Sequence, residues 1–234
     1  MPQPQPRHVV SSGSGDPVQG SASPGHALLS CGVISALLYV ATDLAASQHY
    51  PGYSMRAQAV SELFAIGAPT RPVVALLFSV SSVLVLAFAL GIWRTAAHRR
   101  QRVLAVSFGG SATIGLLLWI AFPMHMRGDA RSFTDTMHLV LASNPFVLLT
   151  LVVVLVSEGG RFRTYTWVTL ALMVGLAVPA FGYADALDAN QPTPWLGALE
   201  RASQYTYQLW QVALSKMLVA RCQGGDRLRA LGTG

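Results

Sequence analysis

Polar side chains recur along the last long segment of the chain at a spacing that could build a binding site. Glu200, Gln204, Gln208, Gln211 and Ser215 follow one another every three or four residues, which places them on one face of a helix. Such a face is not stable against lipid. It indicates either the wall of a water-filled cavity or hydrogen bonds between helices, worth about 0.6 kcal/mol each in membranes. The sequence leaves both interpretations open.

Ionisable residues form a second group of candidates, at the expected outer ends of the helices. Together with the polar stripe, the candidate ligand-binding residues are Asp43, Glu62, Asp135, His138, Glu200, Gln204, Gln208 and Gln211. Asp43 lies within an apolar segment, where a carboxylate costs up to roughly 2.5–3.5 kcal/mol at the bilayer centre, so we expect it to have a partner. The candidate partners are Arg56, Arg71, Arg131 and Arg201. We favour structural ion pairing over catalysis for this group.

Three residues of the fourth apolar segment and the loop before it have the side chains of a zinc site. Asp135 and His138 are three residues apart and share a helix face, and His125 precedes them. With water in an open position, such a zinc ion could hydrolyse an ester of an outer-leaflet lipid. However, the chain has no HExxH motif, and Asp135 also suits the first turn of a helix. We therefore assign no metal site and keep His125, Asp135 and His138 as candidates only.

The remaining chemistry-bearing residues identify no cofactor and no catalytic group. The six histidines fall in tails, loops or helix ends, which argues against haem held between two histidines inside a bundle. Ser61 has no neighbouring histidine, which argues against a serine nucleophile. Cys31 and Cys222 are both expected on the cytoplasmic side, so we expect no disulfide.

Composition shows which elements must position these residues. Apolar residues make up 52% of the 234 residues and charged residues only 11%, against roughly 25% charged in soluble domains. The apolar residues fall in runs of about 20, the length that spans a bilayer as a helix. The sequence predicts an all-α, polytopic bundle of about six transmembrane helices. The expected spans are residues 27–46, 72–93, 103–122, 137–156, 165–181 and 200–220.

The bundle is predicted as a single domain, residues 26–221, between a disordered tail at 1–25 and a second tail at 222–234. The first 25 residues lack the pattern of a cleaved signal peptide, so the first span is expected to be an uncleaved anchor. Pro145 should kink the fourth span. Val60, Leu63 and Phe64 share a face and predict a short helix in the membrane interface.

The distribution of basic residues predicts the orientation. Ten of the sixteen Lys and Arg lie on the side of the termini and five on the other side, while Lys216 lies near the end of the last span. By the positive-inside rule both termini should be cytoplasmic, with the protein in a bacterial plasma membrane. The net charge of +6 is explained by these loops and by anionic lipid head groups, so we expect no nucleic-acid partner.

Several short motifs resemble a known family. They are residues 61–69 (SELFAIGAP), Phe122 with Pro123, His138, and residues 197–201 (GALER) with Trp210. Over roughly residues 27–221 the chain is similar to the bacterial and archaeal domain-of-unknown-function family 998. The resemblance implies a compact bundle of about six spans and brings no activity, cofactor or substrate. Members typically have glycine at Phe64 and an acidic residue at His125, which weakens any site carried over to His125.

Three functions follow from these patterns. The first is a non-enzymatic membrane protein that binds or passes a small polar or lipidic molecule through an outward-facing polar cavity. The second is a metal-dependent membrane hydrolase, which requires three ligands within about 2.0–2.2 Å of one metal ion. The third is a structural subunit of a membrane complex. The lipid bilayer is the expected partner, and the sequence does not determine the oligomeric state.

Overall fold

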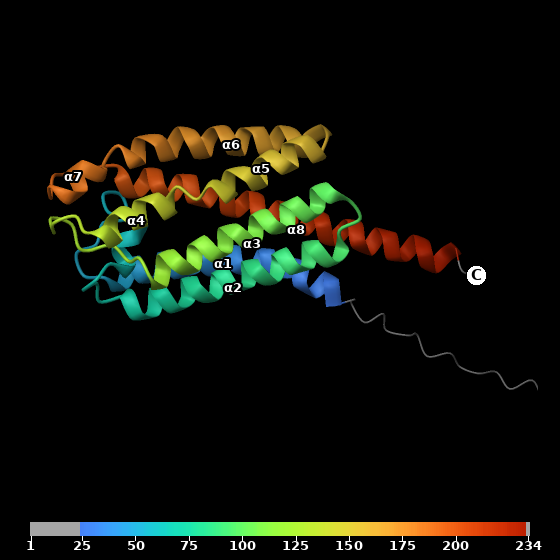
Figure 1. Cartoon of the computed structure of the whole chain (residues 1–234), viewed down its shortest axis with the longest axis horizontal. Coiled ribbons are helices and arrows are strands. Elements are labelled where there is room, and N and C mark those ends of the chain that lie inside the picture. The colour runs from blue at the N-terminus through green and yellow to red at the C-terminus, as the bar shows by residue number, and fades with distance from the viewer. Residues whose placement is uncertain (1–23, 233–234) are drawn as a thin grey trace, which may run out of the picture.

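The computed structural model describes residues 24–232, and the side chains of residues 25–225. The described chain is helical, with short connections and no strand. Its helices are α1 (Pro24–His49), the 3₁₀ helix η1 (Val60–Phe64), α2 (Arg71–Thr95), α3 (Arg99–Ile120), α4 (Phe133–Ala142), α5 (Pro145–Ser157), α6 (Gly160–Phe181), α7 (Ala184–Asp188) and α8 (Leu196–Gly232) (Figure 1). The predicted tail at 1–25 lies outside the described residues except for Pro24 and Gly25, which begin α1.

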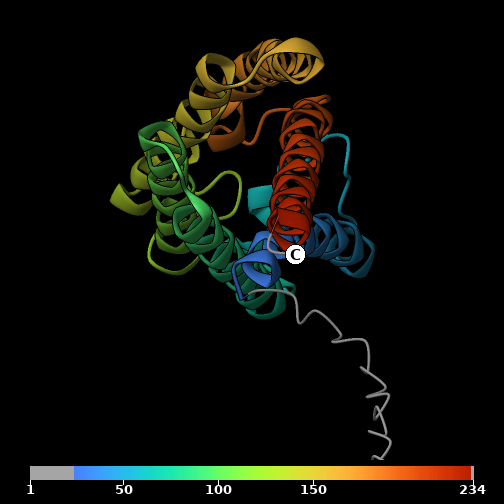
Figure 2. The same ribbon diagram turned by 90° about the vertical axis from the view of Figure 1, so that its right-hand side faces the viewer.

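The long helices form a ring. Each packs against the next in chain order, from α1 through α2, α3, α5 and α6 to α8, and α8 then packs against α1 (Figure 2). The axes run roughly alongside one another (Figure 1). A ring that closes on itself can surround a space, and its first and last members are brought together although they are far apart in sequence.

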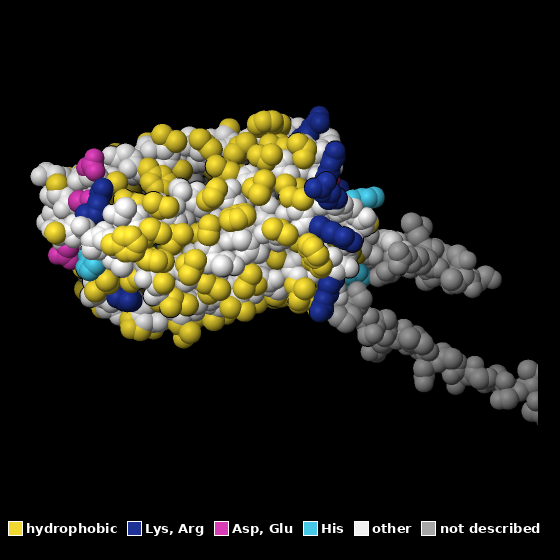
Figure 3. Space-filling view, viewed as in Figure 1, with side chains coloured by type: hydrophobic (Ala, Val, Ile, Leu, Met, Phe, Trp, Pro, Cys, Tyr) yellow, Lys and Arg dark blue, Asp and Glu magenta, His cyan; other side chains and the backbone are white. Residues whose placement is uncertain are grey.

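Among the described residues, five segments are long and apolar enough to cross a membrane, and they include the combined α4–α5 segment Phe133–Ser157. The sixth predicted span, now α8, is long enough but more polar, and it runs beside the others against α1 and α6. Figure 3 shows hydrophobic side chains across the middle of the visible face, with Lys and Arg gathered at the end where α1 begins. The predicted all-α polytopic bundle is confirmed. We call the two ends the basic end and the acidic end.

The basic half of the bundle contains a closely packed apolar core. All six long helices of the ring (α1, α2, α3, α5, α6 and α8) contribute to it. The rings of Phe88 and Phe108 meet at 4.9 Å, and the Trp210 ring stacks on Phe108 at 6.3 Å. The indole N–H of Trp210 donates to Thr166 Oγ1 at 3.0 Å, which satisfies the only polar atom of that side chain. In this half, buried rings therefore occupy the space inside the helical ring.

The fourth span is broken, which goes beyond the predicted kink. α4 ends at Ala142 and α5 begins at Pro145, while Asn144 between them has a φ of 27°. Pro145 removes a backbone donor and disfavours helical geometry in the residue before it, so the helix interrupts here. Asn144 Nδ2 donates to Ser111 Oγ at 3.1 Å, which ties the break to α3.

The short helix predicted around Val60, Leu63 and Phe64 is present as η1, and its apolar face is buried. Val60, Leu63 and Phe64 are at most 2% exposed, and they pack against Tyr39, Val74 and Phe78 within the bundle. The apolar face that suggested binding to the lipid surface is instead covered by α1 and α2. This segment therefore forms part of the inner wall at the acidic end.

Candidate ligand-binding site

The ring of helices surrounds a partly open cavity of about 460 Å³ in the acidic half of the bundle. Its walls come from the six long helices α1, α2, α3, α5, α6 and α8, from η1, α4 and α7, and from the loop at residues 124–129. The sequence-predicted residues that line it are Asp135, His138, Glu200, Gln204, Gln208 and Gln211. Its volume lies in the range of roughly 300–1,000 Å³ that small-molecule sites occupy.

The first two turns of the α8 stripe present polar groups to this cavity. Glu200 Oε2 accepts a hydrogen bond from the backbone N–H of Val60 at 2.9 Å, and its other oxygen has no partner among the described residues. The side chains of Gln204 and Gln208 line the cavity and likewise have no hydrogen-bond partner in the described part of the chain. Polar groups inside a membrane bundle need water or a ligand to satisfy them.

Further along α8, the same stripe makes hydrogen bonds between helices, which is the second interpretation that the sequence left open. Gln211 Nε2 donates to Gly32 O and to Ser35 Oγ, both at 2.9 Å, and Gln211 is 2% exposed. Ser215 Oγ donates to Leu29 O at 2.6 Å. These bonds join α8 to α1, so this part of the stripe holds helices together and is not free to bind a ligand with the same groups.

Two further polar groups on the opposite side of the cavity are unsatisfied. Asn144 Oδ1 is the only buried side-chain oxygen or nitrogen without a hydrogen bond among the described residues, and Asn144 lines the cavity. His138 is 4% exposed, and its Nδ1 donates to Phe122 O at 2.8 Å. Its Nε2 has no partner in the described region. The sequence identified Asn144 only as part of a helix distortion, because no spacing pattern shows where a break will face.

Asp43 does not line the cavity but is held in a buried ion pair with Arg201, one of its four candidate partners. Arg201 Nε donates to Asp43 Oδ2 at 3.0 Å and Nη2 donates to Asp43 Oδ1 at 2.9 Å. Asp43 is 0% and Arg201 5% exposed, and the Tyr205 hydroxyl also donates to Asp43. Because α1 and α8 are the ends of the ring, this ion pair closes it at the acidic end.

Arg201 also fastens the loop between α1 and η1. Its Nη1 donates to Met55 O at 2.8 Å and to Gln58 O at 2.9 Å. Gly197 permits this contact, because a Cβ at that position would lie 2.1 Å from Gln58 O and 2.4 Å from Met55 O. Tyr53, whose pKa is raised by burial, receives a hydrogen bond from Arg201 Nη2 at 2.6 Å. The GALER motif at residues 197–201 thus has a structural explanation.

Glu62 also belongs to a structural ion pair and does not line the cavity. Arg127 binds it with two hydrogen bonds of 2.9 and 2.8 Å, to Oε2 and Oε1. Gln58 Nε2 adds a third bond at 3.0 Å, and the hydrogen bonding of the Arg127 guanidinium to the Glu62 carboxylate raises the pKa of Arg127. The sequence did not single out Arg127 as a partner, because its loop position gave no indication of which carboxylate it would meet.

The three residues considered for zinc do not converge. His125 Nδ1 lies 2.9 Å from Asp135 Oδ2, but His138 Nδ1 is used by the Phe122 carbonyl. Asp135 also accepts from the backbone N–H of Ser132 at 2.8 Å, as expected for a capping residue. Among the described residues no group of three His, Cys, Asp or Glu side chains is arranged to hold a metal ion. The geometry therefore gives no support to the hydrolase hypothesis.

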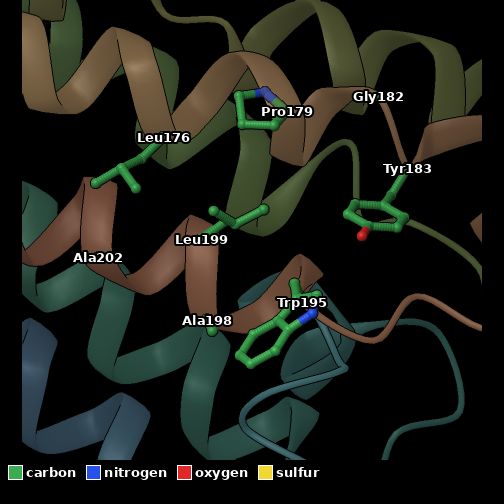
Figure 4. Close-up of a pocket in the computed structure, with 8 residues that line it drawn as sticks. All are labelled: Leu176, Pro179, Gly182, Tyr183, Trp195, Ala198, Leu199 and Ala202. Atoms are coloured by element: carbon green, nitrogen blue, oxygen red, sulfur yellow. The ribbon is translucent and has the colours of Figure 1, made fainter.

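A second hollow, of about 490 Å³, lies between the end of α6 and the start of α8 (Figure 4). It is lined by Leu176, Pro179, Gly182, Tyr183, Trp195, Ala198, Leu199 and Ala202. None of the candidate site residues lies there, and the lining carries no charged side chain. This groove offers shape and apolar surface, whereas the internal cavity also offers unsatisfied polar groups.

The helical ring and the apolar belt define a polytopic all-α membrane protein, and the ring surrounds a cavity. Residues 33–217 match the model of the family described as protein of unknown function (DUF998). The match covers more than half of the chain, so the chain belongs to this family, as its short motifs suggested. Neither a curated protein nor a solved structure matches the chain.

Proposed function

We propose that this protein is a multi-pass protein of the cell membrane that binds a small polar or lipidic molecule in its internal cavity. The observation that carries the proposal is the polar face of α8, where Glu200, Gln204 and Gln208 line the cavity with hydrogen-bonding groups that no described residue satisfies. A cavity with largely apolar walls and a few convergent polar groups is the usual form of a small-molecule site.

The packing of the basic half supports binding rather than passage through the bundle. The rings of Phe88, Phe108 and Trp210 fill the axis of the ring below the cavity. A molecule that enters the cavity from the acidic end is therefore stopped by these packed rings in this conformation.

A pair of matched substitutions tests the proposal. Ala177 lines the internal cavity, whereas Ala202 lines the outer groove, so Ala177→Phe fills the first space and Ala202→Phe the second. The full chain is extracted from membranes in mild detergent, and native mass spectrometry detects retained molecules. We expect the wild type and Ala202→Phe to retain a bound molecule and Ala177→Phe to lose it.

The opposite pattern counts against the proposal. If Ala177→Phe retains the same molecule as the wild type, the molecule is bound elsewhere. If no variant retains or takes up any molecule after incubation with a membrane lipid extract, the cavity is not a binding site.

A further inference from the structure

The charges around the cavity are not evenly compensated. Asp43 is bound by Arg201 and Glu62 by Arg127, each with two charge-assisted hydrogen bonds. Glu200 has only the N–H of Val60 on one oxygen, and no cationic side chain of the described residues bonds to it. Glu200 is therefore a cavity-lining carboxylate whose free oxygen points to no protein partner.

The neighbouring arginine cannot neutralise Glu200 without breaking other bonds. All three nitrogens of the Arg201 guanidinium are already used, by Asp43, Tyr53 and the carbonyls of Met55 and Gln58. An uncompensated charge in a low-dielectric site costs several kcal/mol, and a bound opposite charge removes that cost. The protein thus leaves a place for a cation beside Glu200.

Aromatic rings lie on the wall next to this carboxylate. Val60, which donates to Glu200, packs in one cluster with Tyr39, Phe64 and Phe78. The rings of Tyr39 and Phe78 stack at 4.6 Å, and the Trp119 ring meets Phe78 at 5.0 Å. Tyr39, Phe64, Phe78 and Trp119 all line the cavity. The negative faces of such rings attract organic cations, and amines are commonly recognised by rings combined with a carboxylate.

We propose that the ligand of this cavity is an amphiphile with a positively charged amine, whose ammonium group binds Glu200 beside the aromatic wall. Gln204 and Gln208, one and two turns further along α8, provide hydrogen bonds to neutral polar groups of the same ligand. The apolar walls cover its hydrocarbon part. This inference depends on the proposed function, because it specifies the ligand class of the same cavity.

The test compares three probes that share one tail and differ in head group: octylammonium, 1-octanol and octanoate. Binding to the detergent-purified full chain is measured by isothermal titration calorimetry with the wild type, Glu200→Gln and Glu158→Gln. Glu200→Gln keeps the shape and the acceptor for Val60, whereas Glu158→Gln removes a carboxylate at the basic end, where Arg221 binds it. We expect octylammonium to bind the wild type and Glu158→Gln at least tenfold more tightly than 1-octanol. The Glu200→Gln variant should lose this preference.

A second arm distinguishes a free amine from a lipid head group. Phosphatidylethanolamine or phosphatidylglycerol is added to the detergent solution before the titration. Loss of octylammonium affinity with phosphatidylethanolamine alone identifies an amine-bearing lipid as the ligand source. An unchanged affinity with both lipids identifies a smaller, free amine. Either result supports a cationic ligand.

Other outcomes overturn the inference. If 1-octanol or octanoate binds the wild type as tightly as octylammonium, the cavity binds amphiphiles without selecting an amine, and the proposed function stands alone. If octylammonium is preferred equally by Glu200→Gln, another group selects the cation and the assignment to Glu200 is wrong. If no probe binds and Ala177→Phe also retains its native adduct, both the inference and the proposed function fail.

Discussion

The two halves of the bundle use their buried side chains in opposite ways. In the basic half, Phe88, Phe108 and Trp210 fill the axis, and the ion pair between Glu158 and Arg221 lies at the surface, with Arg221 52% exposed. In the acidic half the axis is hollow, and the ion pairs of Asp43 and Glu62 are buried in the wall around the cavity.

This difference indicates how a helical ring can remain closed around a space. Apolar packing holds the basic half, because buried side chains from all six long helices form one hydrophobic cluster there. In the acidic half a cavity takes up much of the space inside the ring, and multidentate arginine bonds between loops and helices add to the packing of its wall. The stability of the cavity should therefore depend on a few charged contacts, and the stability of the basic half on many apolar ones.

The largest expected effect comes from Arg201→Met, compared with Arg221→Met at the other end. Removal of Arg201 leaves Asp43 buried without a counter-charge, which should lower the free energy of unfolding by about 3–5 kcal/mol. Arg221 belongs to an exposed pair, and its loss should cost about 0.2–1 kcal/mol. Equilibrium unfolding in mixed micelles measures both values.

A double variant provides the control for Arg201. Asp43→Asn combined with Arg201→Met removes both charges and should recover part of the loss, because no uncompensated carboxylate remains. If Arg201→Met and Arg221→Met lower the free energy of unfolding by the same amount, the acidic half does not depend on its charged contacts more than the basic half does.

A smaller effect is expected from Gly197→Ala, compared with Gly109→Ala in α3. A Cβ at Gly197 meets Gln58 O at 2.1 Å, whereas one at Gly109 has no atom within 4 Å. Gly197→Ala should therefore lower the free energy of unfolding by about 1–3 kcal/mol through overpacking. Gly109→Ala should be neutral or stabilise by up to about 1 kcal/mol, because alanine favours helix. If Gly197→Ala is as stable as the wild type, the loop is not tightly held to α8.

The smallest effect concerns pH and the basic end. The hydrogen bonds from Arg221 lower the pKa of Glu158 below its ordinary value of 4.5. The stabilisation is thus complete above pH 4.5 and is lost as the pH falls through the lowered pKa. For an exposed pair it should amount to about 0.2–1 kcal/mol. Thermal unfolding between pH 7 and pH 3 should show this loss in the wild type relative to Glu158→Gln, and identical pH profiles would contradict the pairing.

The candidate site could be predicted from the sequence only in part. Helical spacing placed Glu200, Gln204, Gln208 and Gln211 on one face, and all four lie in the wall of the cavity. The spacing did not show that Gln211 is already bonded to Gly32 and Ser35. The stripe from Glu200 to Ser215 is about 22 Å long, so one continuous face borders the open half of the ring and then the packed half.

The sequence by itself determined that this is a membrane protein and that it is built from long helices. Runs of about 20 apolar residues require helices in a bilayer, because every backbone polar group must be satisfied within its own segment. Only the tertiary structure decided which polar groups are paired. Asp43 and Arg201 are 158 residues apart in the chain, and they meet because α8 packs against α1. Local periodicity fixes the face of a helix but not the partner that covers it, so the pairing of Asp43 and the free oxygen of Glu200 both depend on how the ring closes.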